Sequence, residues 1–130
     1  MDAKELRIGN WVFCDEINNF YPGGFIQVEE ILSDGIERSH GGLTVYELDQ
    51  IHPIPLTPEI LEKAGFTFYD NPNKTPSRIY KIGSDFRICK CYNQDHFTLW
   101  DYPYGKSIRY LHQLQNLYFA LTGEELNIEL

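Results

Sequence analysis

The sequence is short of the residues that several common classes of protein require. It has three cysteines, an odd number that cannot complete a disulfide framework. No stretch approaches the roughly 18 consecutive apolar residues of a membrane-spanning helix. Residues Met1–Glu5 lack the basic region and the apolar run that begin a secretory signal peptide. These absences predict a protein of the reducing cytoplasm with no membrane segment.

Basic residues are also scarce, and they are unevenly distributed. Eleven Lys and Arg face nineteen Asp and Glu, so the formal net charge is −8 at pH 7. Residues 1–55 hold ten acidic and three basic residues, a charge of −7, whereas residues 56–130 hold nine and eight, a charge of −1. Proteins bind duplex nucleic acid largely through Lys and Arg on phosphates, so this balance opposes such binding. The acidic half is either a solvated surface that aids solubility or a face for a basic partner.

The chain does have enough apolar material for a core, because 42% of its residues are hydrophobic and 15% are aromatic. Its first half contains short runs of strand-forming residues separated by turn residues. The predicted strands are Leu6–Cys14, Phe25–Leu32 with a bulge at Glu29–Glu30, Ile36–Arg38, Leu43–Tyr46 and Ile51–Ile54. This density of short strands predicts a small bent β-sheet or an SH3-like barrel over residues 1–55.

The centre of the chain predicts a short helix, Pro58–Ala64, with signals at both ends. Thr57 is a good N-cap, Pro58 suits the first helical position, and Gly65 suits the left-handed position after the helix. Five further strands separated by turn residues follow, and they predict an antiparallel meander. These strands are Phe66–Asp70, Arg78–Ile82, Phe86–Tyr92, His96–Asp101 and Lys106–Tyr110.

The hydrophobic period then changes from that of a strand to that of a helix. One face of a helix over residues 111–122 carries an apolar stripe of Leu111, Leu114, Tyr118 and Leu121. We expect Gly123 to end this helix, and Leu114 and Leu121 to be core residues where it packs on the meander. The sequence therefore predicts an α+β fold in one compact unit. Its parts are a β-rich, barrel-like subdomain at 1–55 and a meander with a C-terminal helix at 56–130.

Few residue patterns point to catalysis or to metal binding. Cys89 and Cys91 lie two apart on a predicted strand, so their thiols would share a face and one ion could bind both. However, the spacing is unusual for zinc, no second pair follows, and buried free thiols are common. Phosphate-binding loops and nucleophile motifs are lacking, and we expect His112 at the surface or boundary of its helix. We predict no enzyme activity, no catalytic residue, no metal and no cofactor, with both cysteines reduced.

The clearest candidate for binding is one face of the meander. Residues 78–110 hold six basic and three acidic residues, a local charge of +3. Strand alternation would gather aromatic and Arg side chains on the face away from the C-terminal helix, namely Tyr80, Arg87, Trp100, Tyr102 and Arg109. Such side chains anchor protein interfaces and can stack on single-stranded bases. The face is either open for such binding or packed against the acidic first half.

Three segments of the chain together resemble a known family. They are Leu6–Asn10 (LRIGN), Pro53–Leu61 (PIPLTPEIL) with Gly65–Phe66, and Leu111–Gly123 (LHQLQNLYFALTG). The resemblance is to small uncharacterised proteins of Bacteroides-group bacteria, their phages and other mobile elements, and it spans nearly the whole chain. It implies an intracellular setting and a mobile-element origin, and it carries over no activity and no site residue.

The function that these observations favour is that of a non-enzymatic interaction or accessory protein. We expect an unknown protein partner rather than duplex nucleic acid or a membrane. Two alternatives stay open. The meander face could bind single-stranded nucleic acid, or the acidic chain could mimic nucleic acid to occupy a host factor.

Overall fold

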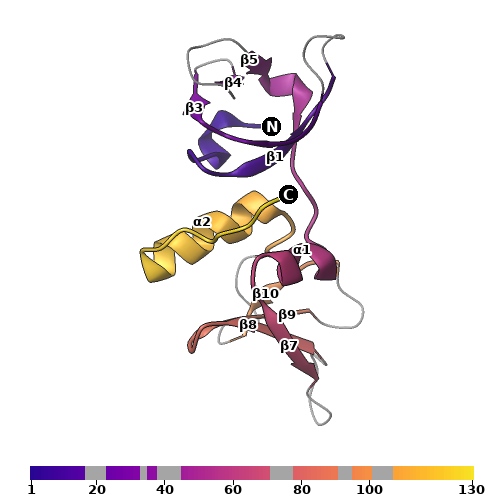
Figure 1. The fold of residues 1–130 in the computed structure, drawn as a ribbon, viewed down its shortest axis with the longest axis vertical. Coiled ribbons are helices and arrows are strands. Elements are labelled where there is room, and N and C mark those ends of the chain that lie inside the picture. Colours follow the sequence, from indigo (N-terminus) through magenta and orange to yellow (C-terminus); the bar gives the residue numbers. More distant parts are fainter. Residues whose placement is uncertain (17–22, 33–34, 38–44, 71–77, 91–94, 101–106) are drawn as a thin grey trace. The chain divides into compact units, whose positions relative to one another are not determined.

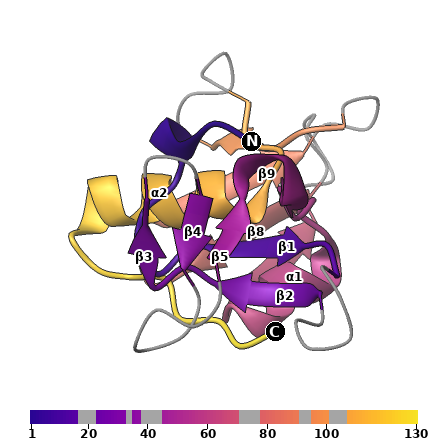
Figure 2. The ribbon, with the colours of Figure 1, turned by 90° about the horizontal axis from the view of Figure 1, so that it is seen from above.

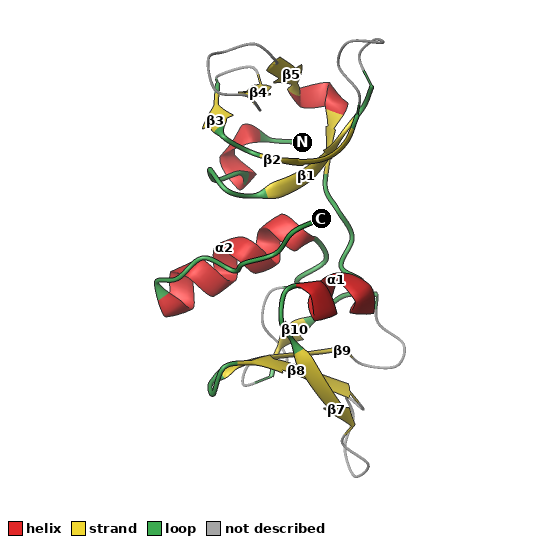
Figure 3. Ribbon diagram, in the orientation of Figure 1, coloured by secondary structure: helices red, strands yellow, loops and turns green. Residues whose placement is uncertain are grey.

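The computed structural model describes residues 1–16, 23–32, 35–37, 45–70, 78–90, 95–100 and 107–130. It is an α+β structure of small antiparallel sheets, a short helix and a C-terminal helix (Figures 1 and 3). Two compact units make up the chain. The first is Met1–Pro55 with Tyr110–Leu117, and the second is Leu56–Arg109 with Tyr118–Leu130. Within the residues that the structure describes, no helix has the length and apolar character to cross a membrane.

The first unit contains two three-stranded antiparallel sheets (Figure 2). One sheet has the order β2-β1-β6, from β1 (Trp11–Cys14), β2 (Gly24–Gln27) and β6 (Ile51–His52). The other has the order β3-β4-β5, from β3 (Glu30–Ile31), β4 (Gly35–Glu37) and β5 (Val45–Glu47). Two short 3-10 turns, η1 (Ala3–Glu5) and η2 (Leu48–Gln50), complete the unit. The pairings of the described strands define two sheets, and closure into an SH3-like barrel stays a prediction.

The predicted strand Phe25–Leu32 is divided between these two sheets, so its prediction as one bulged strand was wrong. The Val28 N–H donates to the Asn10 carbonyl at 2.8 Å and so continues the pairing of β2 with β1. Glu30, two residues later, pairs with Glu37 of β4 instead. The chain therefore changes sheet at the position where the alternation of apolar residues breaks. The predicted turn at residues 39–42 lies outside the described residues.

Alternation along the strands of the first unit puts every second side chain into its core. In β1, Val12 and Cys14 are fully buried while Phe13 between them is exposed. The cluster formed in this way draws on both sheets and on the segment before β1. Its buried members are Leu6, Val12, Cys14, Ile26, Val28, Ile36, Tyr46 and Ile51.

The C-terminal helix α2 (Leu111–Thr122) supplies the first unit with two side-chain amides. Gln115, which is 1% exposed, accepts the Trp11 N–H at 2.9 Å and donates to the Gly9 carbonyl at 3.1 Å. The Asn116 side chain donates to the Glu5 carbonyl at 2.9 Å and accepts from the Asn10 amide at 2.9 Å. These bonds satisfy polar groups that the short strands leave unpaired, and they fix the register of the helix against residues 5–11.

His112 is also buried in the first unit, and its prediction as a surface or boundary residue was wrong. It is 1% exposed, its ring stacks on Tyr110 at 6.0 Å between centroids, and neither ring nitrogen has a hydrogen-bond partner among the described residues. Burial lowers the pKa of His112 below its ordinary value, because a charged imidazolium would lose its hydration. The charge of Glu5 opposes this shift more weakly.

The second unit begins with the helix α1 (Pro58–Lys63), which starts at the predicted residue and ends one residue before the predicted Ala64, its C-cap. The Ile60 N–H donates to the Thr57 hydroxyl at 3.2 Å, which caps the first turn. After the helix, Gly65 has a φ of 94°, and the Phe66 N–H donates to the Leu61 carbonyl at 3.0 Å. Only a glycine adopts this left-handed conformation without strain, so the chain can turn directly into the sheet.

A four-stranded antiparallel sheet follows α1, with the order β10-β9-β8-β7. Its strands are β7 (Thr67–Asp70), β8 (Arg78–Ile82), β9 (Phe86–Lys90) and β10 (Thr98–Leu99). Phe86 on this sheet makes edge-to-face contacts with Phe66 at 6.2 Å and with Tyr118 of α2 at 5.1 Å between centroids. These aromatic contacts line the covered face of the sheet.

The last turn of α2 differs from its prediction in one respect. Leu114 is fully buried as expected, but Leu121 is 59% exposed, so its prediction as a core residue was wrong. The buried side chains of α2 belong to its first half, and the apolar stripe continues beyond the part of the helix that is covered. Leu126 and Ile128, which follow the helix end at Gly123, are buried instead.

Leu114 and Leu121 form a matched pair for testing this burial. We expect Leu114→Ala to lower the free energy of unfolding by about 2–5 kcal/mol, because it leaves a cavity in the core. We expect Leu121→Ala to change it by less than about 0.5 kcal/mol, because the side chain is in water. Urea denaturation followed by circular dichroism measures both values, and equal losses would contradict the burial pattern.

His112 makes the stability depend on pH in a defined direction. Its pKa is lowered in the folded state, so the unfolded chain binds more protons, and stability falls as the pH drops through the ordinary value of 6.5. We expect His112→Gln to flatten the change in unfolding free energy between pH 7.5 and the folded-state pKa. Denaturation midpoints measured across this range test it, and the remaining histidines in the variant serve as the internal control. An unchanged slope would contradict the assignment.

Candidate functional site

The register of the second-unit sheet determines which side chains share a face with Arg87, where Ile79, Cys89 and Thr98 are buried and Lys81 is exposed. Arg87 of β9 lies directly opposite Lys81 of β8, which lies opposite Thr67 of β7. On the other side, the Trp100 N–H donates to the Arg87 carbonyl at 3.0 Å and extends the row beyond β10. Since directly opposed residues in an antiparallel sheet point to the same face, one face carries a row of an indole, a guanidinium and an ammonium group.

Tyr80 does not belong to this face, although the sequence predicted it there. It lies opposite Ile88, is 4% exposed, and contacts Phe97 at 5.9 Å between ring centroids. The physical reason is the register of β8, in which Ile79 rather than Tyr80 shares a face with Cys89. A shift of one residue exchanges the two faces of a strand.

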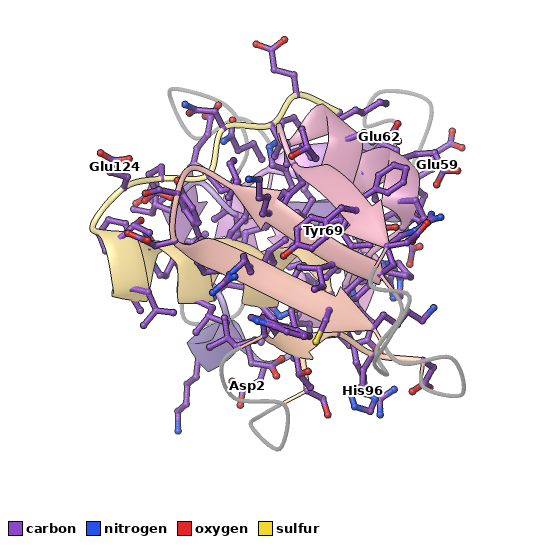
Figure 4. The ribbon with its side chains drawn as sticks, turned by 90° about the horizontal axis from the view of Figure 1, so that it is seen from below. Asp2, Glu59, Glu62, Tyr69, His96 and Glu124 are labelled. Atoms are coloured by element: carbon purple, nitrogen blue, oxygen red, sulfur yellow. The ribbon has the colours of Figure 1, made fainter. Side chains whose placement is uncertain are left out.

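A different tyrosine, Tyr69, stands on the face with Arg87. Tyr69 lies opposite Ile79, which lies opposite Cys89, and Cys89 is two residues from Arg87 on the same strand. Tyr69 is 41% exposed and projects from the sheet in Figure 4. The sequence could not identify it, because the face on which a β7 side chain lies depends on the register of β7 with β8.

Another predicted residue, Arg109, is paired with an acidic residue instead of extending this row. The Arg109 guanidinium donates to the Asp95 carboxylate at 2.7 Å, and His96 contacts the same oxygen at 3.4 Å. Arg109 and then His96 lower the pKa of the exposed Asp95 carboxyl below its usual value. Tyr102 lies outside the described residues.

The resulting surface combines positive charge with aromatic area. We call it the basic-aromatic face, and it consists of Tyr69, Lys81, Arg87 and Trp100. Lys81 and Tyr69 are exposed, whereas Arg87 and Trp100 are half-buried. Lys81 and Arg87 carry like charges on directly opposite residues, an arrangement that an anionic ligand bound to both would stabilise. Carboxylate and phosphate groups are the anions that such a pair binds.

The cysteines are not arranged for chemistry in the described part of the chain. Cys14 and Cys89 are both fully buried, and the Cys89 sulfur lies 3.5 Å from the Thr98 hydroxyl. Cys91 lies outside the described residues. Among the residues that are described, no three His, Cys, Asp or Glu side chains gather closely enough to hold a metal ion.

The chain matches no protein-family model, no curated protein and no solved structure. Its function therefore has to be argued from the geometry of its own residues. Within the described part of the second unit, the basic-aromatic face brings positive charge and aromatic side chains together.

The assignment of the two faces can be tested by stability alone. We expect Tyr80→Ala to lower the free energy of unfolding by about 3–5 kcal/mol, because the ring is buried among aromatic side chains. We expect Lys81→Glu, one residue away, to leave it unchanged or to raise it by up to about 1 kcal/mol, because a like-charge pair with Arg87 becomes an attractive one. Thermal and urea denaturation measure both, and a reversed order would show that the register is wrong.

Proposed function

We propose that this protein is a non-enzymatic binding protein whose basic-aromatic face holds an acidic segment of a protein partner. The observation that carries the proposal is the row of Lys81 on β8, Arg87 on β9 and Trp100 directly after β10, with Tyr69 of β7 on the same face. Trp, Tyr and Arg are the residues that most often anchor protein interfaces. A rigid sheet holds them in place before binding, which reduces the entropy lost on association.

A protein partner suits the charges better than a nucleic acid. The whole chain has a formal net charge of −8, and the basic residues of this face are Lys81 and Arg87. A long polyanion would meet repulsion over its whole length, whereas a short acidic segment needs to reach only Lys81 and Arg87. Single-stranded nucleic acid stays the second candidate, because Tyr69 and Trp100 could stack on bases.

A non-enzymatic role fits the placement of the candidate nucleophiles. The thiols of Cys14 and Cys89 are both buried, so a substrate in solution does not reach them. Free buried thiols also suit a reducing compartment, and we propose that the protein acts in the cytoplasm. The resemblance to proteins of phages and mobile elements supports an accessory role of this kind.

A double variant tests the face without disturbing the core, because both side chains are exposed. We expect Lys81→Glu with Tyr69→Ala to lose at least one protein that wild type retains in an affinity pull-down quantified by mass spectrometry, with recovery reduced at least fivefold. Nuclease treatment of the lysate should leave that recovery unchanged, since the partner is held by protein contacts.

The matched control changes the same kinds of residue elsewhere in the second unit. Lys63→Glu with Phe68→Ala removes an exposed lysine of α1 and a ring that is 45% exposed on the opposite face of the sheet. This control should retain the partner. Identical partner sets for wild type and both variants would contradict the proposal. Binding of a fluorescein-labelled oligo-dT that only the Lys81 variant loses would establish the nucleic-acid alternative instead.

A further inference from the structure

The first unit exposes a pair of phenylalanines on the outer face of its β2-β1-β6 sheet. Phe13 of β1 and Phe25 of β2 lie directly opposite each other, and their rings meet edge to face at 5.8 Å between centroids. They are 40% and 52% exposed. Their exposure follows from the register, because Val12 and Cys14 on either side of Phe13 occupy the core. The two rings therefore form an aromatic surface that is exposed to solvent and is not part of the core.

Polar groups border this pair on one side. His52 of β6 lies opposite Phe13 on the other edge of β1, and its Nε2 lies 3.0 Å from the Asp15 carboxylate. Asp15 follows Phe13 by two residues, so it belongs to the same face of the strand. The side chains of His52 and Asp15 are each about half exposed, at 48% and 51%. The carboxylate is thus held in position beside the aromatic pair and remains accessible to a ligand.

The charge around this face has the opposite sign to that of the basic-aromatic face. Residues 1–55 carry ten acidic and three basic residues, and residues 110–117, which complete the unit, add no Asp, Glu, Lys or Arg. The unit as a whole therefore has a formal charge of −7. A field of this sign attracts cationic ligands and repels anionic ones.

We propose that the outer face of the β2-β1-β6 sheet binds a peptide segment that presents Lys or Arg side chains. The π-faces of Phe13 and Phe25 attract a cation together with the apolar stem of its side chain. The Asp15 carboxylate forms the charge-assisted hydrogen bond that orients it. Neither a purely apolar nor an acidic segment satisfies both groups, so the chemistry selects a basic partner. This site is separate in residues and in charge from the basic-aromatic face.

A short synthetic peptide provides a direct probe. We expect fluorescein-labelled GRGRGRG to bind the full chain in a fluorescence anisotropy titration at low salt, while GSGSGSG and GEGEGEG do not bind. Phe25→Leu keeps the side chain apolar but removes the π-face, and it should weaken binding about two- to fivefold. Phe25→Ala with Asp15→Asn should weaken it at least tenfold, because both kinds of contact are lost.

The matched control carries the same substitutions in the second unit. Phe119→Ala with Glu59→Gln removes a ring that is 40% exposed and an acidic residue of α1 (labelled in Figure 4), and the affinity for GRGRGRG should stay that of wild type. Thermal midpoints of all variants verify that they are folded. Equal weakening by the two double variants would mean attraction to net charge alone, and would overturn the proposal.

Two further results would also overturn it. One is wild-type affinity for GRGRGRG in the folded Phe25→Ala, Asp15→Asn variant. The other is a dimer in sedimentation velocity that Phe25→Ala dissociates, which would assign the face to a second copy of this chain.

Discussion

The first unit depends on two neighbouring amides of α2. Gln115 and Asn116 bond the backbone and side chains of residues 5–11, more than 100 positions earlier in the chain. A buried backbone group without a partner costs about 1–3 kcal/mol, and strands of two to four residues leave many such groups at their ends. The amides supply those partners, so a sheet too short to be stable alone acquires a fixed edge. Phe13 and Phe25 can face water because this polar contact, together with the core behind them, holds the strands in register.

The same contacts involve the three segments for which we proposed a family resemblance. Two of them, residues 6–10 and 111–123, meet through Asn10 and Asn116. The third meets the second where the Leu111 N–H donates to the Ile54 carbonyl at 2.8 Å. These are structural contacts that hold one unit together. The residues proposed to bind partners lie elsewhere, on faces of two sheets, so the proposed resemblance carries no information about a ligand.

Features decided by local chemistry could be predicted from the sequence. The ends of α1 follow from Thr57 and Gly65, whose capping needs only residues a few positions away. Features decided by pairing could not. Tyr80 was placed on the wrong face because its face depends on the register of β8 with β9, and the exposure of Leu121 depends on what covers the helix rather than on its period. The candidate site was therefore found in part: the strands and the charge were predictable, but the choice between two neighbouring tyrosines was not.

Because α2 contributes residues to both units, the first unit can form all of its contacts only late in synthesis. Residues 1–55 are synthesised first, yet the Trp11 N–H and the Gly9 carbonyl bond a side chain encoded 104 and 106 positions later. At about 5–20 residues per second, the 60 residues from Leu56 to Gln115 take roughly 3–12 s to synthesise, and the first unit lacks its last contributor for that time. The four-stranded sheet of the second unit is translated within that interval. Because synthesis runs from the N-terminus to the C-terminus, the first segment to be made is the last to complete its hydrogen bonds. A chain that terminates before residue 115 leaves the Trp11 N–H and the Gly9 carbonyl without their native partner.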